Sequence, residues 1–454
     1  MSAIITDPFK KQFMQNIFDE VKNLTGRYYI GIGKNDQWNS TETVPTPTDT
    51  PRTIREAQNA LQSVKAVAGA SFVIPRRNWS SGSVYDAFDD NVAAIPTNSY
   101  YVLTEDNQVY ICLQQSKNAN GAANVSTVKP TGTSQNAFKT SDGYTWKFLY
   151  ALSASNASAF LSANFVPVEK ILDSAGGTGL TAIEVQQATV QDSAVAGRIL
   201  NVAVTNGGSG YTSAPSITLT GNSRAIGDSA QATATVSGGS VVKIEMLNES
   251  SGSGKNFTNA SVTITGGGGS GAVARAVLGP PNGIGADPRD ELKATSLMFN
   301  AKPSGIEGGD FLAGTNVDFR QVMLIKNPKD SANGTTLTAT TGKALRFLKT
   351  DLTFAGNLAV DELIFNNTVP PAKAYVNQVS DSDVYFHQTD STGYTPFGIG
   401  DTLTDEQGNT GTINAAPAVE DLINTSGDIL YIENRAPVIR DASQTEDIKV
   451  VVTL

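Results

Sequence analysis

The sequence has very few of the residues on which most enzymatic and metal sites depend. Its 454 residues include one cysteine and one histidine. A single cysteine excludes an internal disulfide and a cysteine-based zinc cage. Any mechanism with a histidine base would have to use His387. We interpret Cys112, in the run Val-Tyr-Ile-Cys-Leu, as a buried residue, and His387 as a packing or surface residue.

Charge is also scarce, and it is mainly acidic. Only 17% of residues are charged, and 33 basic against 43 acidic side chains give a formal net charge of −10. Such a field repels phosphate backbones, so we expect no binding to nucleic acid. No apolar run approaches the length of a membrane span, and the N-terminus lacks the apolar region of a signal peptide. We therefore expect no membrane insertion and synthesis in a cytoplasm.

The residues that are abundant favour β-structure. Glycine, serine, threonine and asparagine are frequent, and they separate short β-type runs such as SFVIP, YYVLT, QVYICLQ and YTWKFLYAL. The length corresponds to about three domains. The chain is therefore predicted to be mainly β.

Two helices are predicted near the N-terminus, on either side of a strand from Arg27 to Gly33. The first begins at Asp7-Pro8 and ends before Gly26, and the second begins at Pro51. Their apolar residues recur at helical spacing, which predicts one buried stripe on each helix. The first stripe is Phe9, Phe13, Ile17, Val21 and Leu24, and the second is Ile54, Ala57, Leu61 and Val64.

Two blocks differ in composition from the rest of the chain. Residues 176–282 hold 19 of the 42 glycines and contain a repeat, GSGYTSAPSITLTG at 208–221 and GSGKNFTNASVTITG at 252–266. Each copy lies between β-type runs, which predicts a pseudo-symmetric β module. Residues 334–426 are rich in threonine and contain a hairpin-like DEQGNTG. The last residues, 428–454, read as two strands around a polar turn.

Three motifs that carry chemistry in other proteins have simpler readings here. Gly266-x-Gly268-x-x-Gly271 fits a dinucleotide fingerprint, but Gly279-Pro280-Pro281 prevents the helix that should follow, so we predict a hairpin loop. Asp86, Asp89 and Asp90 are interpreted as a solvated acidic loop, although a glycosidase needs no more than a carboxylate pair. No set of metal ligands has a suitable spacing. We predict no catalytic, cofactor or metal site.

Six segments together resemble one protein family. They are GIGKNDQW (31–38), VIPRRNW (73–79), DGYTWKFLYAL (142–152), GADPRDEL (285–292), DFRQVMLIKNP (318–328) and DILYIENRAPVIRDASQTEDIKVVV (428–452). In this order they are similar to the baseplate wedge subunit, gene product eight, of T-even-like contractile-tailed phages. The last segment is the most specific. The gaps between segments include the two blocks of different composition.

The resemblance implies a fold and a set of partners. It implies a β-sandwich core decorated with helices and no catalysis. With the two N-terminal helices, the two blocks of different composition read as small β modules added to that core, and no cofactor is expected because no cofactor motif is present. The resemblance also implies a place in the virion, at the tail baseplate, with other wedge proteins and a second copy of the chain as partners. The expected organisation is core at 1–175, a glycine-rich β-repeat insert at 176–282, core at 283–333, a small β insert at 334–426 and core strands at 427–454.

Within the resembling segments, aromatic, arginine and neighbouring polar residues are candidate interface or core anchors, because tryptophan, tyrosine and arginine dominate binding hot spots. The candidates are Trp38, Arg76, Arg77, Trp79, Tyr144, Trp146, Arg320, Tyr431, Glu433, Asn434 and Arg435. Two alternatives to a structural role remain open at this point. One is a receptor- or glycan-binding virion protein that uses the glycine-rich insert, in which Tyr211 and Phe257 read more easily as core residues. The other is a virion polysaccharide hydrolase.

Overall fold

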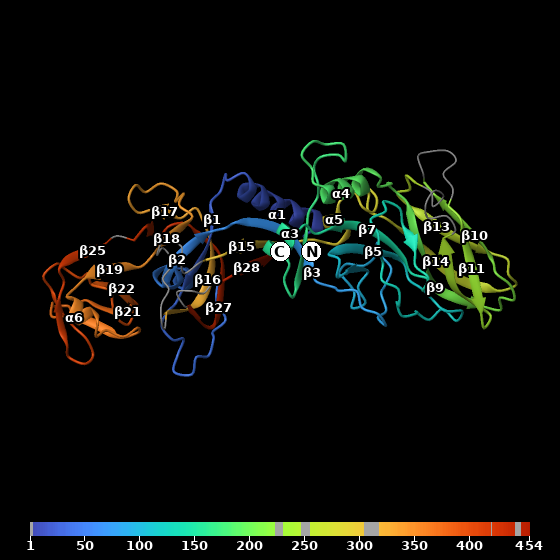
Figure 1. Ribbon diagram of the computed structural model, residues 1–454. Helices are drawn as coiled ribbons and strands as arrows, with labels where there is room; N and C mark the ends of the chain where they lie inside the picture. The colour runs from blue at the N-terminus through green and yellow to red at the C-terminus, as the bar shows by residue number, and fades with distance from the viewer. Residues whose placement is uncertain (1–2, 223–229, 247–254, 304–316, 419, 441–445) are drawn as a thin grey trace. The chain divides into compact units, whose positions relative to one another are not determined.

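The computed structural model describes all residues except 1–2, 223–229, 247–254, 304–316, 419 and 441–445 (Figure 1). Strands hold 39% of the residues and helices 12%, against about 20–25% strand in an average protein. The mainly β prediction is therefore confirmed. The chain divides into two compact units. Unit 1 comprises Met1–Met14, Ser71–Ser296 and Thr453–Leu454, and unit 2 comprises Gln15–Ala70 and Leu297–Val452.

The two N-terminal helices are confirmed as α1 (Asp7–Lys22) and α2 (Pro51–Asn59), with a strand between them. Thr50 caps α2, because its side chain accepts a hydrogen bond from the Thr53 backbone N–H. Four further helices were not predicted: α3 (Ala154–Phe160), α4 (Ala182–Asp192), α5 (Pro288–Glu291) and α6 (Leu352–Ala355).

The predicted buried faces of both N-terminal helices need correction. On α1, Phe9 is 62% exposed and Phe13 is 47% exposed, whereas Met14 is fully buried. Ile17 and Val21 are half-buried, so within the helix the exposed part of the stripe is Phe9 and Phe13. In the second segment the helix ends at Asn59, so Leu61 and Val64, although buried, belong to the strand that follows.

Unit 2 contains an antiparallel five-stranded sheet, which we call the central sheet. Its order is β18 (Thr341–Lys343), β2 (Leu61–Ala66), β1 (Tyr28–Gly33), β16 (Val317–Lys326) and β27 (Asp428–Arg440). Tyr29, Val64, Met323 and neighbouring apolar residues form its core. One small two-stranded sheet accompanies it, β17 (Lys329–Asp330) with β26 (Leu422–Ile423). β15 (Ser296–Ala301) lies between β28 (Ile448–Thr453) and β3 (Gly69–Pro75) in a four-stranded sheet.

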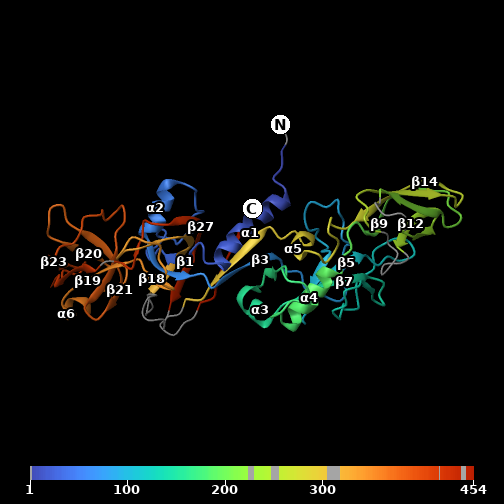
Figure 2. The ribbon, with the colours of Figure 1, turned by 90° about the horizontal axis from the view of Figure 1, so that it is seen from above.

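A seven-stranded antiparallel sheet also lies in unit 2, drawn in orange and red in Figure 2. Its order is β24 (Thr410–Thr412), β23 (Thr402–Thr404), β20 (Leu363–Asn366), β21 (Lys373–Ser380), β22 (Asp383–His387), β19 (Arg346–Lys349) and β25 (Ala415–Ala418). The hairpin expected at DEQGNTG is confirmed, because β23 and β24 pair around it.

In unit 1, an aromatic core packs on the four-stranded sheet β4 (Tyr101–Leu103), β5 (Gln108–Gln114), β7 (Thr145–Ala151) and β6 (Phe138–Lys139). Cys112 is fully buried in this core, as predicted, and Val190 of α4 packs into the same cluster. Elsewhere in the unit, β3 (Gly69–Pro75) pairs with β8 (Phe165–Val168).

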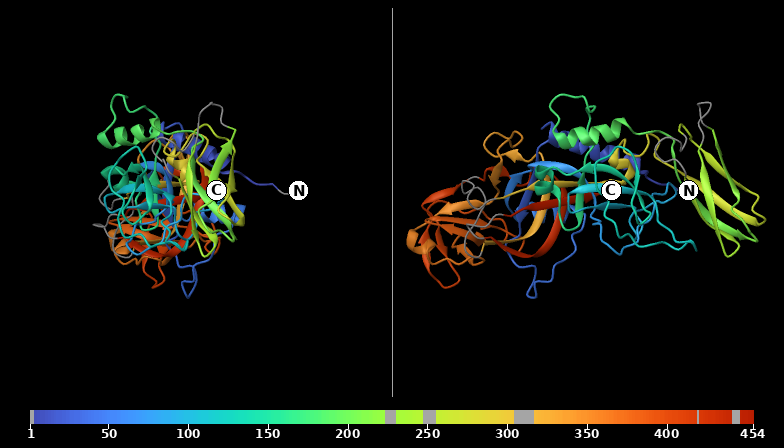
Figure 3. Two further views of the ribbon diagram at one scale, coloured as in Figure 1. Left: turned by 90° about the vertical axis from the view of Figure 1, so that its right-hand side faces the viewer. Right: turned by 45° about the vertical axis from the view of Figure 1, so that its right-hand side comes forward.

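The glycine-rich repeat in unit 1 forms two antiparallel sheets, which can be followed in Figure 3. One has the order β11 (Ala232–Ser237), β12 (Ser240–Met246), β9 (Ile199–Ser209) and β14 (Ser270–Leu278), and the other pairs β10 (Ser216–Gly221) with β13 (Ala260–Thr265). Thr218 pairs with its repeat equivalent Thr263, and Val202 pairs with Ile244 at the matching position of the flanking runs. The predicted pseudo-symmetry thus appears as a local two-fold axis.

The glycine fingerprint in this repeat is followed by a strand, not by a helix. Gly266 to Gly269 connect β13 to β14, and these strands belong to different sheets, so the predicted hairpin is corrected to a crossover between sheets. A Cβ atom at Gly269 would lie 2.5 Å from Tyr211 Cγ. At this position glycine therefore allows close packing on an aromatic core residue.

Candidate functional site

A cavity of about 500 Å³ lies within unit 2, and we call it the polar pocket. Its walls come from residues 34–38, which follow β1, from residues 45–60 around α2, and from residues 387–394, which follow β22. Gln321 and Asn434 complete the lining. This volume falls within the range of small-molecule sites, about 300–1,000 Å³.

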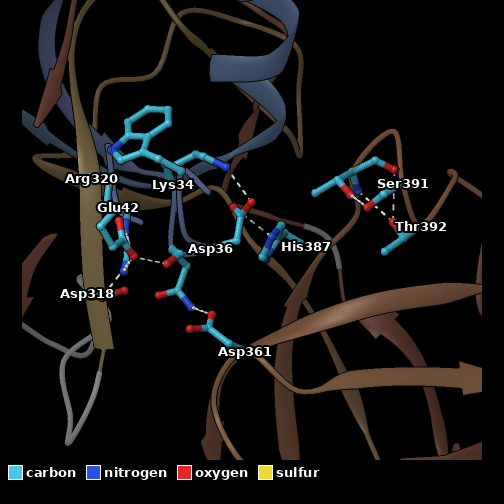
Figure 4. A network of polar contacts seen from close by, with 12 residues as sticks. Lys34, Asp36, Glu42, Asp318, Arg320, Asp361, His387, Ser391 and Thr392 are labelled. Carbon is cyan, nitrogen blue, oxygen red and sulfur yellow. Dashed lines mark hydrogen bonds and ion pairs between the residues drawn. The ribbon is translucent and has the colours of Figure 1, made fainter. Parts of the chain in front are cut away.

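His387, the single histidine of the chain, is 5% exposed and lies at the end of β22 (Figure 4). Its Nδ1 lies 2.6 Å from Asn377 Oδ1, and its Nε2 lies 3.5 Å from Asp36 Oδ1. Burial alone would raise the pKa of Asp36, but the contact with His387 and the Lys34 ammonium outweigh it and hold that pKa well below its usual value. Asp36 is therefore a carboxylate.

Lys34 links this carboxylate to an aromatic ring. Its Nζ donates to Asp36 Oδ2 at 2.5 Å and lies 5.3 Å from the centre of the Trp38 ring. Its backbone has a positive φ of 64°, and its N–H donates to the Ala60 carbonyl. The left-handed backbone conformation is strained for a lysine, and this hydrogen bond stabilises it. Trp38 itself is fixed by a hydrogen bond from Nε1 to the Arg435 carbonyl.

A second ionic cluster supports the segment after β1. Arg320 on β16 is 4% exposed and pairs with Glu42 at 2.8 Å and with Asp318 at 2.9 Å. Its guanidinium also donates to the Asn35 carbonyl, and the Asn35 side chain donates to Asp361 at 2.6 Å. Figure 4 shows this cluster beside the His387 contact. The contacts of the buried Arg320 guanidinium therefore fix the segment between β1 and Glu42.

The rim of the polar pocket carries an ion-paired network of its own. Arg52 on α2 pairs with Glu56 at 2.7 Å and with Asp390 at 3.2 Å. The Tyr394 hydroxyl donates to Asp390 at 2.9 Å and accepts from Asn59. Every carboxylate that lines the polar pocket therefore has a cationic partner.

Two buried atoms in the lining have no hydrogen-bond partner of good geometry among the described residues. They are His387 Nε2 and Gln321 Oε1. Gln321 is 5% exposed and donates through Nε2 to Asn434 Oδ1 at 2.8 Å. A buried polar atom without a partner costs about 1–3 kcal/mol. A bound molecule with suitable donors would recover this cost.

The arrangement has no nucleophile in contact with a base. Ser391 lines the polar pocket, but its hydroxyl bonds to Thr389 Oγ1 at 2.7 Å. Within the described part of the chain, no group of three or more histidine, cysteine and acidic side chains is placed to hold a metal ion.

Most of the candidate anchors have partners inside the protein. Tyr144 and Trp146 are fully buried in the aromatic core of unit 1, and Trp79 packs against that core while Nε1 donates to Ser126 Oγ. Arg76 donates to Asn78 and to the Ser162 carbonyl. Trp38 and Asn434 line the polar pocket, and Arg320 is held by the ion pairs described above. Tyr431 and Glu433 bond to each other at 3.0 Å.

Two candidates are different. Arg77 is exposed and Arg435 is half-buried, and among the described residues neither side chain takes part in a hydrogen bond or ion pair. Their guanidinium groups are therefore available to partners.

In unit 1, an arginine pairs with two carboxylates of the acidic loop. Arg275 pairs with Asp89 at 2.6 Å and with Asp90 at 2.5 Å, and the Asp86 carboxylate accepts from Gln115. These contacts tie the loop to β14. Tyr211 and Phe257 are buried in the core of the repeat, as predicted.

One buried pair was not predicted from the sequence. Burial raises the pKa of Glu291 to about 8, and burial lowers the pKa of Lys147 to about 8. The Glu291 carboxylate accepts from the Gly285 N–H, and Lys147 donates to the Gln135 carbonyl. Within DGYTWKF and GADPRDEL nothing in the residue pattern marks these two side chains as buried.

Comparison with known proteins gives no assignment. No family model matches the chain, and no curated protein sequence matches it. Among the described residues, no helix combines the length and the apolar character needed to span a membrane.

Proposed function

We propose that the chain is a structural subunit of the baseplate wedge of a contractile-tailed phage. In this proposal it has no catalytic activity and assembles with neighbouring wedge proteins and with a second copy of itself. It is made in the host cytoplasm and carried in the virion, where it takes part in tail assembly and contraction. The observation that supports the proposal best is that the resembling segments, far apart in the sequence, contact one another within each unit.

In unit 2, three of these segments meet in the central sheet. GIGKNDQW continues from β1, DFRQVMLIKNP forms β16, and the C-terminal segment forms β27, and these strands are neighbours in the order β1, β16, β27. Arg320 donates to the Asn35 carbonyl, Gln321 to Asn434, and Trp38 to the Arg435 carbonyl. Contacts of this kind are expected if the shared segments build a shared core.

The other three segments meet in unit 1. Trp79 of VIPRRNW packs against the cluster that contains Tyr144 and Trp146 of DGYTWKFLYAL. Glu291 of GADPRDEL interacts electrostatically with Lys147 of the same segment. The resemblance therefore concerns residues that belong together in space.

The finer architecture is part of the proposal. A β-sandwich core with inserted modules at 176–282 and 334–426 is supported by strand pairing inside each block, namely the two sheets of the repeat and the seven-stranded sheet. The edges of the second block pair outside it, because β18 joins β2 and β26 joins β17.

Association requires surfaces that the protein does not cover itself. The exposed stripe on α1, with Phe9 and Phe13, is apolar, and exposed apolar patches mark interaction sites. Arg77 and Arg435 add two available guanidinium groups, a residue type common in binding hot spots. We assign contact with wedge neighbours or a second copy to these residues.

The test is to locate the chain in purified phage particles. Antibodies against the chain, used on purified tails of the phage that encodes it, are expected to label the baseplate and not the sheath, and mass spectrometry should find the chain in washed virions. Absence of the chain from the virion, or labelling elsewhere on the particle, would contradict the proposal.

A further inference from the structure

We infer that the polar pocket binds a short neutral saccharide. The inference concerns residues 34–60 and 387–394 of unit 2, and it goes beyond the assembly role proposed above. Three features of the pocket favour such a ligand: the pairing of its charges, a buried acceptor that lacks a partner, and its aromatic rings.

Each charged side chain that lines the polar pocket already has a partner of opposite charge. Asp36 is paired with Lys34 at 2.5 Å, and Glu56 and Asp390 share Arg52. A phosphate would have to compete with Asp36 for the Lys34 ammonium. A cationic ligand would have to compete with Lys34 or Arg52 for a carboxylate. A charged molecule thus gains no unpaired counter-charge here, which favours an uncharged ligand.

One buried acceptor of the lining lacks a partner. His387 Nδ1 lies 2.6 Å from Asn377 Oδ1, and His387 Nε2 lies 3.5 Å from Asp36 Oδ1, so both ring nitrogens already face oxygen atoms. Gln321 Oε1 is buried in the same lining, and no described residue donates to it. A sugar hydroxyl can donate to this oxygen without bringing a charge into the pocket.

The polar pocket also has the aromatic rings and hydroxyl groups that a saccharide needs for binding. Trp38 is half-buried and Tyr394 is 52% exposed, and both line the polar pocket. Ring faces of this kind pack against the apolar C–H surface of a sugar, while the polar edge stays hydrogen-bonded. Thr46, Thr48 and Thr389 also line the cavity. Their hydroxyls can donate or accept, as the two faces of a saccharide require.

The experiment uses the full chain and saturation-transfer-difference NMR. The probes are glucose, galactose, N-acetylglucosamine, maltose, lactose and chitobiose, each at about 10 mM, which detects affinities in the millimolar range. Inorganic phosphate and arginine amide serve as anionic and cationic probes. We expect saturation transfer to at least one neutral saccharide and none to the charged probes.

The variants change two exposed residues of the pocket lining, Ser391 and Tyr394. Ser391 lines the polar pocket, and its hydroxyl bonds only to Thr389 Oγ1, so substitutions there should leave the fold intact, as a melting curve will verify. Ser391→Trp should fill the cavity and weaken saccharide binding at least tenfold, whereas the matched control Ser391→Ala should keep it within twofold. Tyr394→Ala should weaken binding more than Tyr394→Phe, which keeps the ring.

Three outcomes overturn the inference. They are no transfer to any neutral saccharide, binding that Ser391→Trp leaves unchanged, and preferential binding of phosphate or arginine amide. None of them bears on whether the chain is found in the baseplate, so this inference and the proposed function can fail independently.

Discussion

At the scale of single residues, buried charge holds the long connection after β1. Arg320 is 4% exposed and contacts Glu42 and Asp318, and the Asn35 carbonyl accepts from the same guanidinium. Removing one partner from a buried ion pair leaves an uncompensated charge, which is more costly than the loss of the pair itself. The motif that contains Arg320 therefore depends on this residue for stability.

Arg320→Met is expected to lower the free energy of unfolding by about 3 kcal/mol, because the largely buried Asp318 keeps its charge without a cation. The additional change Asp318→Asn should recover part of the loss. Urea denaturation measures both. Arg77→Met, at an exposed arginine, is the matched control and should stay within about 0.5 kcal/mol of wild type. A loss of similar size in the control would show that the ion cluster is not responsible.

The raised pKa of Glu291 predicts an unusual dependence of the protein's stability on pH. Burial raises its pKa from 4.5 to about 8, so between these values the folded protein keeps a proton that the unfolded chain has lost. Stability should therefore fall as the pH rises from about 5 to 8, by on the order of 2 kcal/mol. Lys147, whose pKa is lowered to about 8, acts in the opposite direction only above that pH.

Glu291→Gln should remove this fall, because the amide keeps an acceptor for the Gly285 N–H and does not titrate. Melting temperatures of both proteins at pH 5, 6, 7 and 8 provide the measurement. Parallel pH profiles for the variant and the wild type would show that Glu291 is not the titrating group.

At the scale of elements, the limits of α1 follow from its sequence, whereas its buried face is set by packing against the rest of the protein. Its limits follow from Asp7-Pro8 and Gly26, and the structure has a helix at Asp7–Lys22. Its buried face does not follow, because the spacing of Phe9 and Phe13 shows only that these residues share a face. Both are exposed, and Met14 is the residue that is buried.

The double change Phe9→Ser and Phe13→Ser is accordingly expected to cost less than about 1 kcal/mol, as surface substitutions do. Met14→Ala should cost about 2–5 kcal/mol. Chemical denaturation ranks the two. If our assignment of the stripe is right, the double variant will also lose co-purification with wedge neighbours while it remains folded. A double variant that melts far below Met14→Ala would show instead that the stripe belongs to the core.

The same distinction applies to the candidate site. Short-range patterns predicted the strand that ends at Gly33, and the capping box of Thr181 with Glu184 could have revealed α4. The contact between Asp36 and His387 joins residues that are 351 positions apart, and no local pattern encodes such a pair. His387 was interpreted as a packing or surface residue for this reason. In the structure it is a buried polar group at the polar pocket.

At the scale of the whole molecule, the repeat is the part that can be removed with least disturbance. The Gly279 N–H donates to the Arg198 carbonyl at 3.1 Å, so the chain enters and leaves the repeat at adjacent points. Val190 of α4, by contrast, packs in the aromatic core of unit 1. A deletion that preserves this core therefore begins after α4.

A chain in which a short glycine linker joins Arg198 to Gly279 is expected to fold and to melt cooperatively, because closing a loop of changed length costs only about 0.6 kcal/mol per doubling. Removing residues 176–282 also removes α4 and should lower the melting temperature further. Calorimetry of both proteins compares them directly. Loss of cooperative melting on removal of 199–278 alone would mean that the repeat is an integral part of unit 1.

The proposed place of the chain in the baseplate wedge is tested most directly by a cryo-electron microscopy map of the intact phage tail. We expect the two units to fit density in the baseplate, with Arg77, Arg435 or the exposed stripe of α1 in contact with a neighbouring wedge protein or a second copy. A tail map at side-chain resolution whose baseplate is fully assigned to other proteins would contradict it.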